Sequence, residues 1–402
     1  MRKIKVIFIL TWLMMACSRD VIQEVSINEN KPHFVTRAEA LSKVQNMLSD
    51  RISRGKELVV DSYEFYTINS QTRSSGDPAC FHIFNFVDDG GFAMVSADNR
   101  TTDIYAYSDH GYLNTTDNAL RNSGVSVFME GAVTYYNHEI ETFGLRDSLI
   151  QNPIDGPIID LDQYTTVDTI DFHRIAYVAP LLTTNWGQNE PYNMFCPIVD
   201  NLETPTGCVP TAIAQIMAYH EYPTSVDDYV LDWTRIKSSD VVSCNDDYAP
   251  NVAYFMREIG DVAESQYAPG GTSTYAVNIV PTFEYFGYHS SGLMFYDEDE
   301  SMSSLNMHWP ICTMGASANA GHAWVVDGYD LYHKTAEYYN YYLYIENPFK
   351  TRVLEEKVYM HCNWGWDGIG YIDSPTGFYL SGAFKEYTNN VKIIPNIRVV
   401  QH

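Results

Sequence analysis

The sequence predicts an α+β protein in two unequal parts, a small mixed domain followed by a larger one. The chain has 402 residues, which corresponds to about two domains, and 45% of them are apolar and 19% charged, as in globular proteins. In the larger part, helical patterns come before strand patterns. This order predicts that a helical half packs against a β half, and clefts prefer such interfaces.

Residues 1–17 are typical of an export signal. A basic start is followed by an apolar run that ends at Ala16 and is too short to span a bilayer. Cys17 comes directly after this run and resembles the lipidated cysteine of bacterial lipoproteins, although Met14 stands where such signals more often have Leu. We therefore expect export from a bacterial cell, as a cell-envelope lipoprotein precursor or a secreted protein. No other segment is predicted to cross a membrane.

Residues 18–142 are predicted to form a small α+β domain. Thr36 and Glu39 form a capping box that begins a helix with one apolar face. Two apolar runs flank the turn Asp88-Asp89-Gly90-Gly91, a hairpin pattern. The predicted strands are 81–87, 92–96 and 104–107, and a second helix is predicted over 125–141. Nothing in this domain has the pattern of a catalytic site.

Residues 143–173 are acidic and interrupted by proline and glycine, which is the composition of a linker. A linker between a plain domain and a reactive one is where a precursor would be cut. An ordinary connection between domains would have the same composition, so the pattern leaves both open.

Residues 174–402 form the predicted larger domain. Helices are expected over 208–220, 252–259 and 276–286, and strands over 322–326, 341–345, 358–360 and 378–380. The first helix follows Gly207 and begins at Cys208. A thiol there faces the positive end of the helix dipole, which favours the nucleophilic thiolate. A buried structural cysteine is the alternative, and it is the usual role of a free cysteine.

A nucleophilic cysteine needs a base and a group that orients the base. His322 is the best candidate base, because it stands between Gly321 and an apolar strand with its ring free to face a cleft. Asn363 is the candidate orienting group, and Trp364 would shield its bond to His322 from water. Gln188, upstream of the cysteine, could join the Cys208 backbone N–H in an oxyanion hole. A buried histidine and core tryptophans remain the alternatives.

Four segments of the larger domain together resemble the streptopain-like cysteine proteases. They are Gly207-Cys208-Val209 with Gln215 to His220, Gly321-His322-Ala323, Asn363-Trp364-Gly365-Trp366, and Gly187-Gln188. Residues 91–98 and 104–107 are similar to the family's propeptide. Two features depart from the family pattern: Asp367 in the turn after Trp366, and the longer segments 329–356 and 369–376.

The resemblance implies a papain-like catalytic domain preceded by an inhibitory propeptide that is cleaved off. It implies that Cys208 is the nucleophile, that His322 is the base and then the acid, and that Asn363 and Trp364 position His322. Gln188 would help to hold the oxyanion. The expected activity is that of an endopeptidase acting on protein or peptide substrates, with the propeptide as intramolecular inhibitor. No metal or organic cofactor is implied.

Charge and cysteine content limit the partners. The formal net charge of −26 argues against nucleic acid or an anionic membrane surface, so we expect membrane contact only through a lipid on Cys17. The other six cysteines are widely spaced and have no CxxC pair, so zinc binding is not expected and pairing stays open. Two other functions remain: a thiol-dependent amidase or transpeptidase, and a non-catalytic surface lipoprotein that uses the fold for binding.

Overall fold

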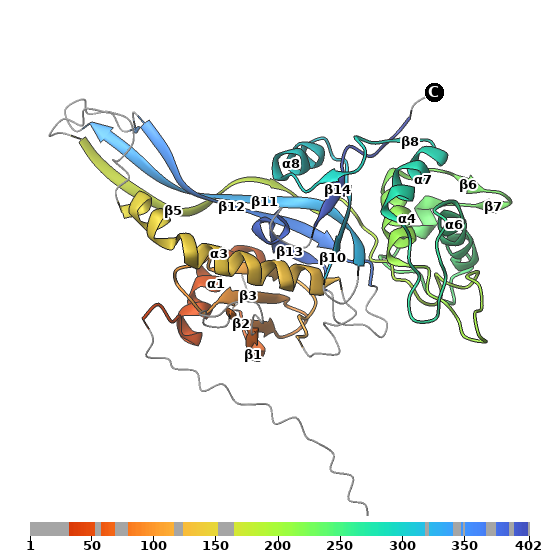
Figure 1. Ribbon diagram of the computed structural model, residues 1–402, viewed down its shortest axis with the longest axis horizontal. Coiled ribbons are helices and arrows are strands. Elements are labelled where there is room, and N and C mark those ends of the chain that lie inside the picture. Colours follow the sequence, from red (N-terminus) through yellow and green to blue (C-terminus); the bar gives the residue numbers. More distant parts are fainter. Residues whose placement is uncertain are drawn as a thin grey trace, which may run out of the picture.

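The computed structural model describes residues 32–52, 58–68, 79–115, 124–151, 165–317, 321–340, 347–348, 350–366, 375–385 and 390–400. The expected export signal, with Cys17, and the expected strand 341–345 lie outside the described residues. No helix in the described ranges has the length and apolar content needed to cross a membrane. Figure 1 shows a helical half beside a long sheet, with the N-terminal elements below that sheet.

The described part of the N-terminal domain contains the helices α1 and α3 and a meander of four strands. The capping box forms as predicted: the Thr36 N–H donates to Glu39 Oε2 at 2.8 Å, and the Glu39 N–H donates to Thr36 Oγ1 at 3.3 Å. The elements are α1 (Arg37–Ile52), β1 (Val60–Ile68), β2 (Ala79–Phe86), β3 (Phe92–Ser96), β4 (Ile104–Ser108) and α3 (Val125–Gln151). The predicted hairpin is the β2–β3 pair.

The two helices cover opposite faces of this meander. Phe81 of β2 packs edge-to-face against Tyr136 of α3. The next side chain, His82, bonds through Nε2 to the Val35 carbonyl, just before α1, at 2.8 Å. Successive side chains of a strand point to opposite faces, so α1 and α3 enclose the strands from both sides.

The segment expected as a linker, residues 143–173, has regular structure at both ends. The helix expected to end at residue 141 continues to Gln151, and β5 spans Thr165–Val178. Five of the first six residues of β5 are β-branched (Thr165, Thr166, Val167, Thr169 and Ile170), which favours a strand in spite of the acidic composition. Residues 152–164 lie outside the part that the structure describes.

The helical half of the larger domain packs around a second apolar cluster, which also contains Met314 and Val325 of the β half. Its elements are α4 (Cys208–His220), α5 (Trp233–Ile236), α6 (Ala249–Val262), α7 (Ile279–Tyr285), and the pairs β6 (Ser225–Val226) with β7 (Tyr229–Val230) and β8 (Tyr288–His289) with β15 (Arg398–Val399). The helix predicted over 276–286 is divided into a 3₁₀ turn, Ala276–Asn278, and α7. Pro281 lacks an N–H and fits the first turn of α7, where no donor is needed.

The β half is antiparallel, as predicted. Its elements are β9 (Met294–Phe295), α8 (Glu298–Asn306), β10 (Ile311–Ala316), β11 (Gly321–Asn340), β12 (Lys350–Asn363), β13 (Gly377–Leu380), the 3₁₀ turn Ser381–Phe384, and β14 (Lys392–Ile394). The strand predicted over 322–326 is the first quarter of β11, which has 20 residues. The α+β class, with a helical half and an antiparallel half, is therefore confirmed.

Three strands leave the body as a long arm (Figure 1). One edge of β11 pairs with β10 up to Val326 and with β5 from Tyr329 onward. Its other edge pairs with β12, whose register reaches Lys350 opposite Tyr338. Residues 329–340 of β11 and 350–356 of β12, which belong to the long segment 329–356, form two of the three strands of this arm.

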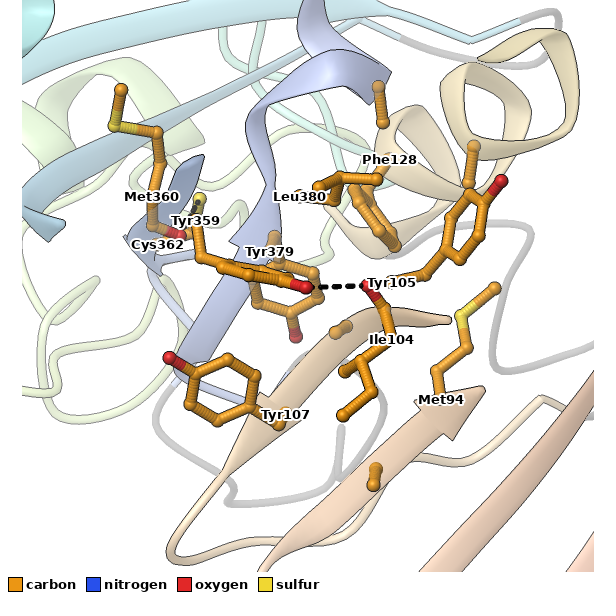
Figure 2. Close-up of a cluster of buried hydrophobic side chains, with 14 of the residues drawn as sticks. Met94, Ile104, Tyr105, Tyr107, Phe128, Tyr359, Met360, Cys362, Tyr379 and Leu380 are labelled. Atoms are coloured by element: carbon orange, nitrogen blue, oxygen red, sulfur yellow. Dashed lines mark hydrogen bonds between the residues drawn. The ribbon is translucent and has the colours of Figure 1, made fainter. Parts of the chain in front are cut away.

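A single sheet runs through both parts of the chain. Its order is β1-β2-β3-β4-β13-β12-β11-β10-β14-β9, so β4 of the N-terminal domain pairs with β13 of the larger domain. Figure 2 shows side chains from both sides of this seam in one apolar cluster, in which the Tyr359 hydroxyl donates to the Ile104 carbonyl at 2.9 Å. The Tyr107 hydroxyl likewise donates to the buried Asp330 at 2.6 Å. The two parts therefore share one core.

Candidate active site

Cys208 is the first residue of α4. Gly207 has φ +97°, a backbone conformation that side chains with a Cβ rarely adopt, and its α-carbon faces Thr272. This turn places the half-buried thiol at the helix N-terminus. The following ten residues, 209–218, are all buried, so α4 is fixed in the core of the helical half.

The surroundings of the Cys208 thiol favour its protonated form. Burial raises its pKa, and this effect outweighs backbone N–H groups, including that of Ala323, that favour the thiolate. The helix terminus was expected to favour the thiolate. It does so, but in the covered site desolvation is the larger effect.

His322 is the second residue of β11 and is buried, with 9% of its surface exposed. Nε2 carries the proton and donates to the Trp364 carbonyl at 2.8 Å. Its ring stacks on those of Trp324 and Trp366, with centroids 6.3 and 6.0 Å away. Burial lowers the pKa of His322 to about 4, although the bond to the Trp364 carbonyl acts in the opposite direction. The imidazole is therefore neutral, and its ring is enclosed rather than free.

The N-terminal domain helps to enclose His322. A Cβ added to Gly124, the residue directly before α3, would lie 2.6 Å from His322 Cδ2 and 2.6 Å from Trp364 Cε3. No carbon atom fits at that distance, so only a glycine lets the backbone lie this close to the imidazole. The first turn of α3 also packs on the larger domain through Val127, which contacts Gly315.

Asn363, the last residue of β12, is 3% exposed and fully engaged. Its Nδ2 donates to the Thr184 carbonyl at 2.8 Å and to Gln215 Oε1 at 3.3 Å. Its Oδ1 accepts from Gln215 Nε2 at 3.2 Å and from the Gly365 N–H at 3.1 Å. The expected bond between Asn363 and His322 is not formed here, because the imidazole donates to the neighbouring Trp364 carbonyl instead.

Trp364 is fully buried beside the histidine. Its ring lies 5.0 Å from that of Trp324 and 5.1 Å from that of Tyr379. Its ring also lies beside that of His322, with centroids 6.3 Å apart, and its backbone carbonyl is the acceptor for His322 Nε2.

Gln188 lies in the segment that precedes the cysteine helix and is 6% exposed. Its carbonyl accepts from the Thr206 N–H at 2.9 Å, which ties this segment to the loop before Cys208. Its side-chain Nε2 is buried and has no hydrogen-bond partner within the described residues. A buried, unpaired amide donor is energetically unfavourable unless something else accepts its hydrogen.

Cys208 and His322 line the same pocket, which has a volume of ≈ 360 Å³. Asn363, Trp364 and Gln188 are not among its lining residues. The pocket lies where the helical half meets the β half, as the fold predicts. Its other lining residues are apolar or small, with one charged side chain, Lys392: Val209, Thr272, Ser273, Thr274, Ala276, Ile279, Met314, Gly315, Gly321, Ala323, Asn390 and Lys392.

Two residues of the site were not singled out from the sequence. Gln215 is fully buried on α4 and bonds to Asn363. The signal for it was present, since it is an amide seven residues after Cys208 in an otherwise apolar helix, and seven residues are about two turns. Gly124 carried no such signal, because its role depends on a contact between distant parts of the chain.

No disulfide or metal cluster joins the described residues of the site. Cys80, Cys196, Cys208, Cys244, Cys312 and Cys362 are all free thiols. In the described ranges no three His, Cys, Asp or Glu side chains converge as a metal site would require.

Comparison with known proteins identifies the family of this chain. Residues 186–371 match the Peptidase C10 family, and residues 32–132 match the Spi protease inhibitor family. The part of the chain that bears the site belongs to the peptidase C10 family. The C10 match contains Gln188, Cys208, His322, Asn363 and Trp364, and the inhibitor match contains Gly124. The predicted resemblance to streptopain-like cysteine proteases is thus confirmed.

Curated relatives of this C10 chain are distant. The thiol protease/hemagglutinin PrtT of Porphyromonas gingivalis is 23% identical over 343 residues, 76% of this chain and 34% of PrtT. The chain therefore spans about a third of the length of PrtT. Streptopain of Streptococcus pyogenes is 23% identical over 334 residues, which are 72% of this chain and 71% of streptopain.

A solved structure supports the fold. A fragment of Prevotella intermedia prointerpain A superposes with a TM-score of 0.51 at 20% identity, and the match covers 85% of this chain and 99% of that fragment. The C10 chain and this fragment therefore share the fold of both the N-terminal and the larger part.

Proposed function

We propose that this C10 chain is the precursor of a cysteine endopeptidase. The observation that carries the proposal is the joint lining of one pocket by Cys208 and His322, where the helical half meets the β half. Family membership supplies the reaction class, hydrolysis of amide bonds through a thiol. The pocket has apolar walls, which suits a protein or peptide substrate rather than a charged small molecule.

The proposed reaction has two steps. The Cys208 thiolate attacks the peptide carbonyl carbon, and the C–N bond breaks as His322 gives its proton to the leaving amine. This forms an acyl-enzyme in which Sγ is bonded to the carbonyl carbon. His322 then takes a proton from water, whose oxygen attacks the same carbon, and the acid leaves as the thiol is regenerated.

Three further residues have proposed supporting roles. Asn363 would orient the His322 ring once that ring leaves the Trp364 carbonyl, and Trp364 would keep water away from the pair. The unpaired Nε2 of Gln188 would donate to the oxyanion together with the Cys208 N–H. A buried donor without a partner is what an oxyanion hole requires before substrate binds.

The precursor is proposed to be inactive because its catalytic pair is uncharged and uncoupled. The His322 Nε2 proton is bound to the Trp364 carbonyl, and the first turn of α3 lies against the ring. Removal of residues 18–142, by cutting within 143–173, would free the imidazole to pair with the Cys208 thiol. Residues 174–402 would then form the mature enzyme. The inhibitory partner is the chain's own N-terminal domain.

Export is part of the proposal. Residues 1–17 would direct the chain out of a bacterial cell, and lipidation of Cys17 would give a cell-envelope precursor. Because the lipid would sit on the propeptide side of the cut, maturation would release the enzyme from its anchor. Neither a nucleic acid nor a cofactor is required by the proposed chemistry.

A time course of self-processing tests the proposal. Purified precursor without residues 1–17 is incubated in reductant beside Cys208→Ala, and both are followed on a gel and by casein hydrolysis. We expect the wild type to shorten by roughly the length of the propeptide and to gain activity, and the variant to do neither. If both stay intact, the linker is cut with an added protease and the assay repeated.

If the wild type has no proteolytic activity after its linker has been cut, the protease proposal is wrong. Cys208 alkylation no faster than that of a free cysteine would then favour a non-catalytic binding lipoprotein. Activity on small amides, or transfer of the acyl group to an added amine without hydrolysis of a peptide library, would instead favour the amidase or transpeptidase alternative.

A further inference from the structure

Gln215 is a buried amide at the meeting point of three segments of the site. It is 0% exposed on α4. Its Oε1 accepts three hydrogen bonds: from Thr184 Oγ1 at 3.1 Å, from the Trp186 N–H at 3.0 Å and from Asn363 Nδ2 at 3.3 Å. Its Nε2 donates to Asn363 Oδ1 at 3.2 Å. Both polar atoms of the side chain are therefore satisfied.

The bonds form a closed ring of three residues from three segments, which closes through the backbone carbonyl of Thr184. Gln215 and Asn363 bond to each other through both of their amide atoms. Asn363 also donates to the Thr184 carbonyl at 2.8 Å, and the Thr184 hydroxyl donates back to Gln215. Buried networks with every member satisfied fix one arrangement of the chain, because any other arrangement leaves polar atoms unpaired.

The three segments are those that bear the proposed catalytic groups. Helix α4 begins with Cys208. The segment at Thr184 and Trp186 leads directly to Gln188, and β12 ends at Asn363. Gln215 thus lies on the same helix as the proposed nucleophile and bonds to both the oxyanion side and the histidine side of the cleft. No other described side chain bonds to both Trp186 and Asn363.

We infer that Gln215 is a positioning residue, which holds Asn363 and the Gln188 segment in register with Cys208. This inference rests on the proposed function. Gln215 lies in the apolar core below the pocket and is not among the residues that line it, so it acts through Asn363 and Trp186 and not on substrate. The ring is already complete in the precursor. Activation would therefore need to move His322, while Asn363 is held in place to receive it.

The test compares three variants of the full precursor after maturation. Gln215→Met keeps the length of the side chain and removes all four bonds. Gln215→Glu keeps the three-fold acceptor but cannot donate to Asn363 Oδ1 unless it is protonated. Thr282→Val is the control, because it also removes a buried polar group of the helical half, a hydroxyl that donates to the Asn278 carbonyl at 2.7 Å.

Melting temperature, kcat and KM for a peptide amide, and the pH dependence of Cys208 alkylation by iodoacetamide are measured for each variant. We expect Gln215→Met to lower kcat between about 10- and 100-fold with little change in KM, because catalytic groups displaced by about 1 Å lose rate of that order. The acid limb of its alkylation profile should move to higher pH, because a poorly oriented imidazolium stabilises the thiolate less. Thr282→Val should lower the melting temperature but leave kcat and the profile near wild type.

Gln215→Glu should keep more activity at low pH, where a protonated carboxyl can donate to Asn363, and should lose it as the pH rises. The inference is overturned if Gln215→Met behaves like Thr282→Val in kcat and in the alkylation profile. If Gln215→Met does not fold, a Gln215→Glu enzyme with wild-type kcat at every pH overturns it as well. If the wild type shows no turnover, the proposed function has failed, and the alkylation profiles, which need no turnover, decide the role of Gln215 alone.

Discussion

At the scale of single residues, the precursor holds its two reactive groups in their neutral forms. Burial raises the pKa of Cys208 and lowers that of His322 to about 4, so neither the thiolate nor the imidazolium is favoured. A thiolate–imidazolium pair stabilises both charges at once, and it requires the Cys208 sulfur and the His322 imidazole to face each other. In this structure His322 Nε2 faces the Trp364 carbonyl. Burial therefore disfavours the Cys208 thiolate and the His322 imidazolium separately.

Gln188→Ala should lower kcat of the mature enzyme by about 10²–10³ with little change in KM, because an oxyanion donor acts in the transition state more than on bound substrate. Steady-state kinetics on a peptide amide measure this split. Gln266→Ala, which shortens an amide elsewhere in the larger domain, is the control and should leave kcat unchanged. A rise in KM with unchanged kcat would assign Gln188 to substrate binding instead.

Acid should destabilise the precursor through His322. The pKa of this residue is about 4 in the folded chain and about 6.5 in the unfolded chain, so the unfolded chain binds more protons between these values. The free energy of unfolding therefore falls as the pH falls from about 6.5 toward about 4. For this one group the loss between pH 7 and pH 5 is about 2 kcal/mol.

Urea titrations of Cys208→Ala precursor at several pH values, with and without His322→Gln, measure that loss as a difference. His322→Gln should remove it, and His289→Gln, at an exposed position, should not. An unchanged pH dependence in His322→Gln would show that the imidazole is not held neutral by burial.

At the scale of elements, the N-terminal end of α3 contacts the site. Gly124 lies against His322 and Trp364 with no room for a Cβ. The same helix continues to Gln151, so the contact at its start and the region expected to be cut are joined by one rigid element. A cut or displacement at the C-terminal end of α3 should therefore alter the contact between Gly124 and His322.

Gly124→Ala should weaken this contact and speed maturation. The added carbon forces His322, Trp364 or the helix to shift, and overpacking of this kind destabilises by about 1–3 kcal/mol. Gly144→Ala is a matched control on the same helix, where a Cβ meets nothing within 4 Å and helix propensity predicts up to about 1 kcal/mol of added stability. Rates of self-processing should separate the two, and a Gly124→Ala precursor that matures at the wild-type rate would argue against the covering role.

Sequence patterns predicted most of the described helices but fewer than half of the described strands. The elements that were predicted depend on capping residues and periodicity, which are local. The Thr36–Glu39 box, the β2–β3 hairpin and the start of α4 all follow from neighbouring residues. The full length of β11, the arm and the pairing of β4 with β13 could not be predicted in this way. They depend on partners far along the chain, and an acidic strand such as β5 has the composition of a linker.

The same division holds for the site. Cys208 and His322 were predicted to meet, and they line one pocket. Their protonation state was not predictable, because it depends on burial by distant parts of the chain, such as Gly124 against His322, which no local pattern encodes. Gln188, Asn363 and Trp364 lie near the site, and their roles stay predictions. Gln215 could have been singled out from the sequence, because it is a polar residue at helical spacing from Cys208. An isolated amide in a helix does not, however, indicate one particular role.

At the scale of the whole molecule, one sheet and one apolar core join the two parts of the chain. The sheet is continuous across the β4–β13 seam, and the apolar cluster of Figure 2 draws on both sides of it. A second apolar cluster, around α4 and α6, also contains Met314, Ala323 and Val325 of the β half. The helical half and the β half of the larger domain therefore share this second core.

Calorimetry of the Cys208→Ala precursor should show the N-terminal domain and the β half unfolding in one transition, because neither buries its core alone. Tyr107→Phe should lower the temperature of that transition, since it leaves the buried Asp330 without the 2.6 Å hydroxyl donor. A separate, earlier transition for residues 18–142, unaffected by Tyr107→Phe, would contradict the shared core.

The seam also sets the order in which the protein can be assembled during synthesis. The Ser108 hydroxyl and the Thr376 carbonyl, which bond at 2.8 Å across it, are 268 positions apart. Strands β1–β4 are synthesised first and can pair among themselves. One edge of β4 then stays unpaired until β13 has been synthesised. Closing so long a loop is slow, and a β4 edge that is already formed gives β13 a template to pair with. A catalytic part made without this template would leave Tyr359, Tyr379 and the β13 edge uncovered during folding, and such edges are where chains aggregate.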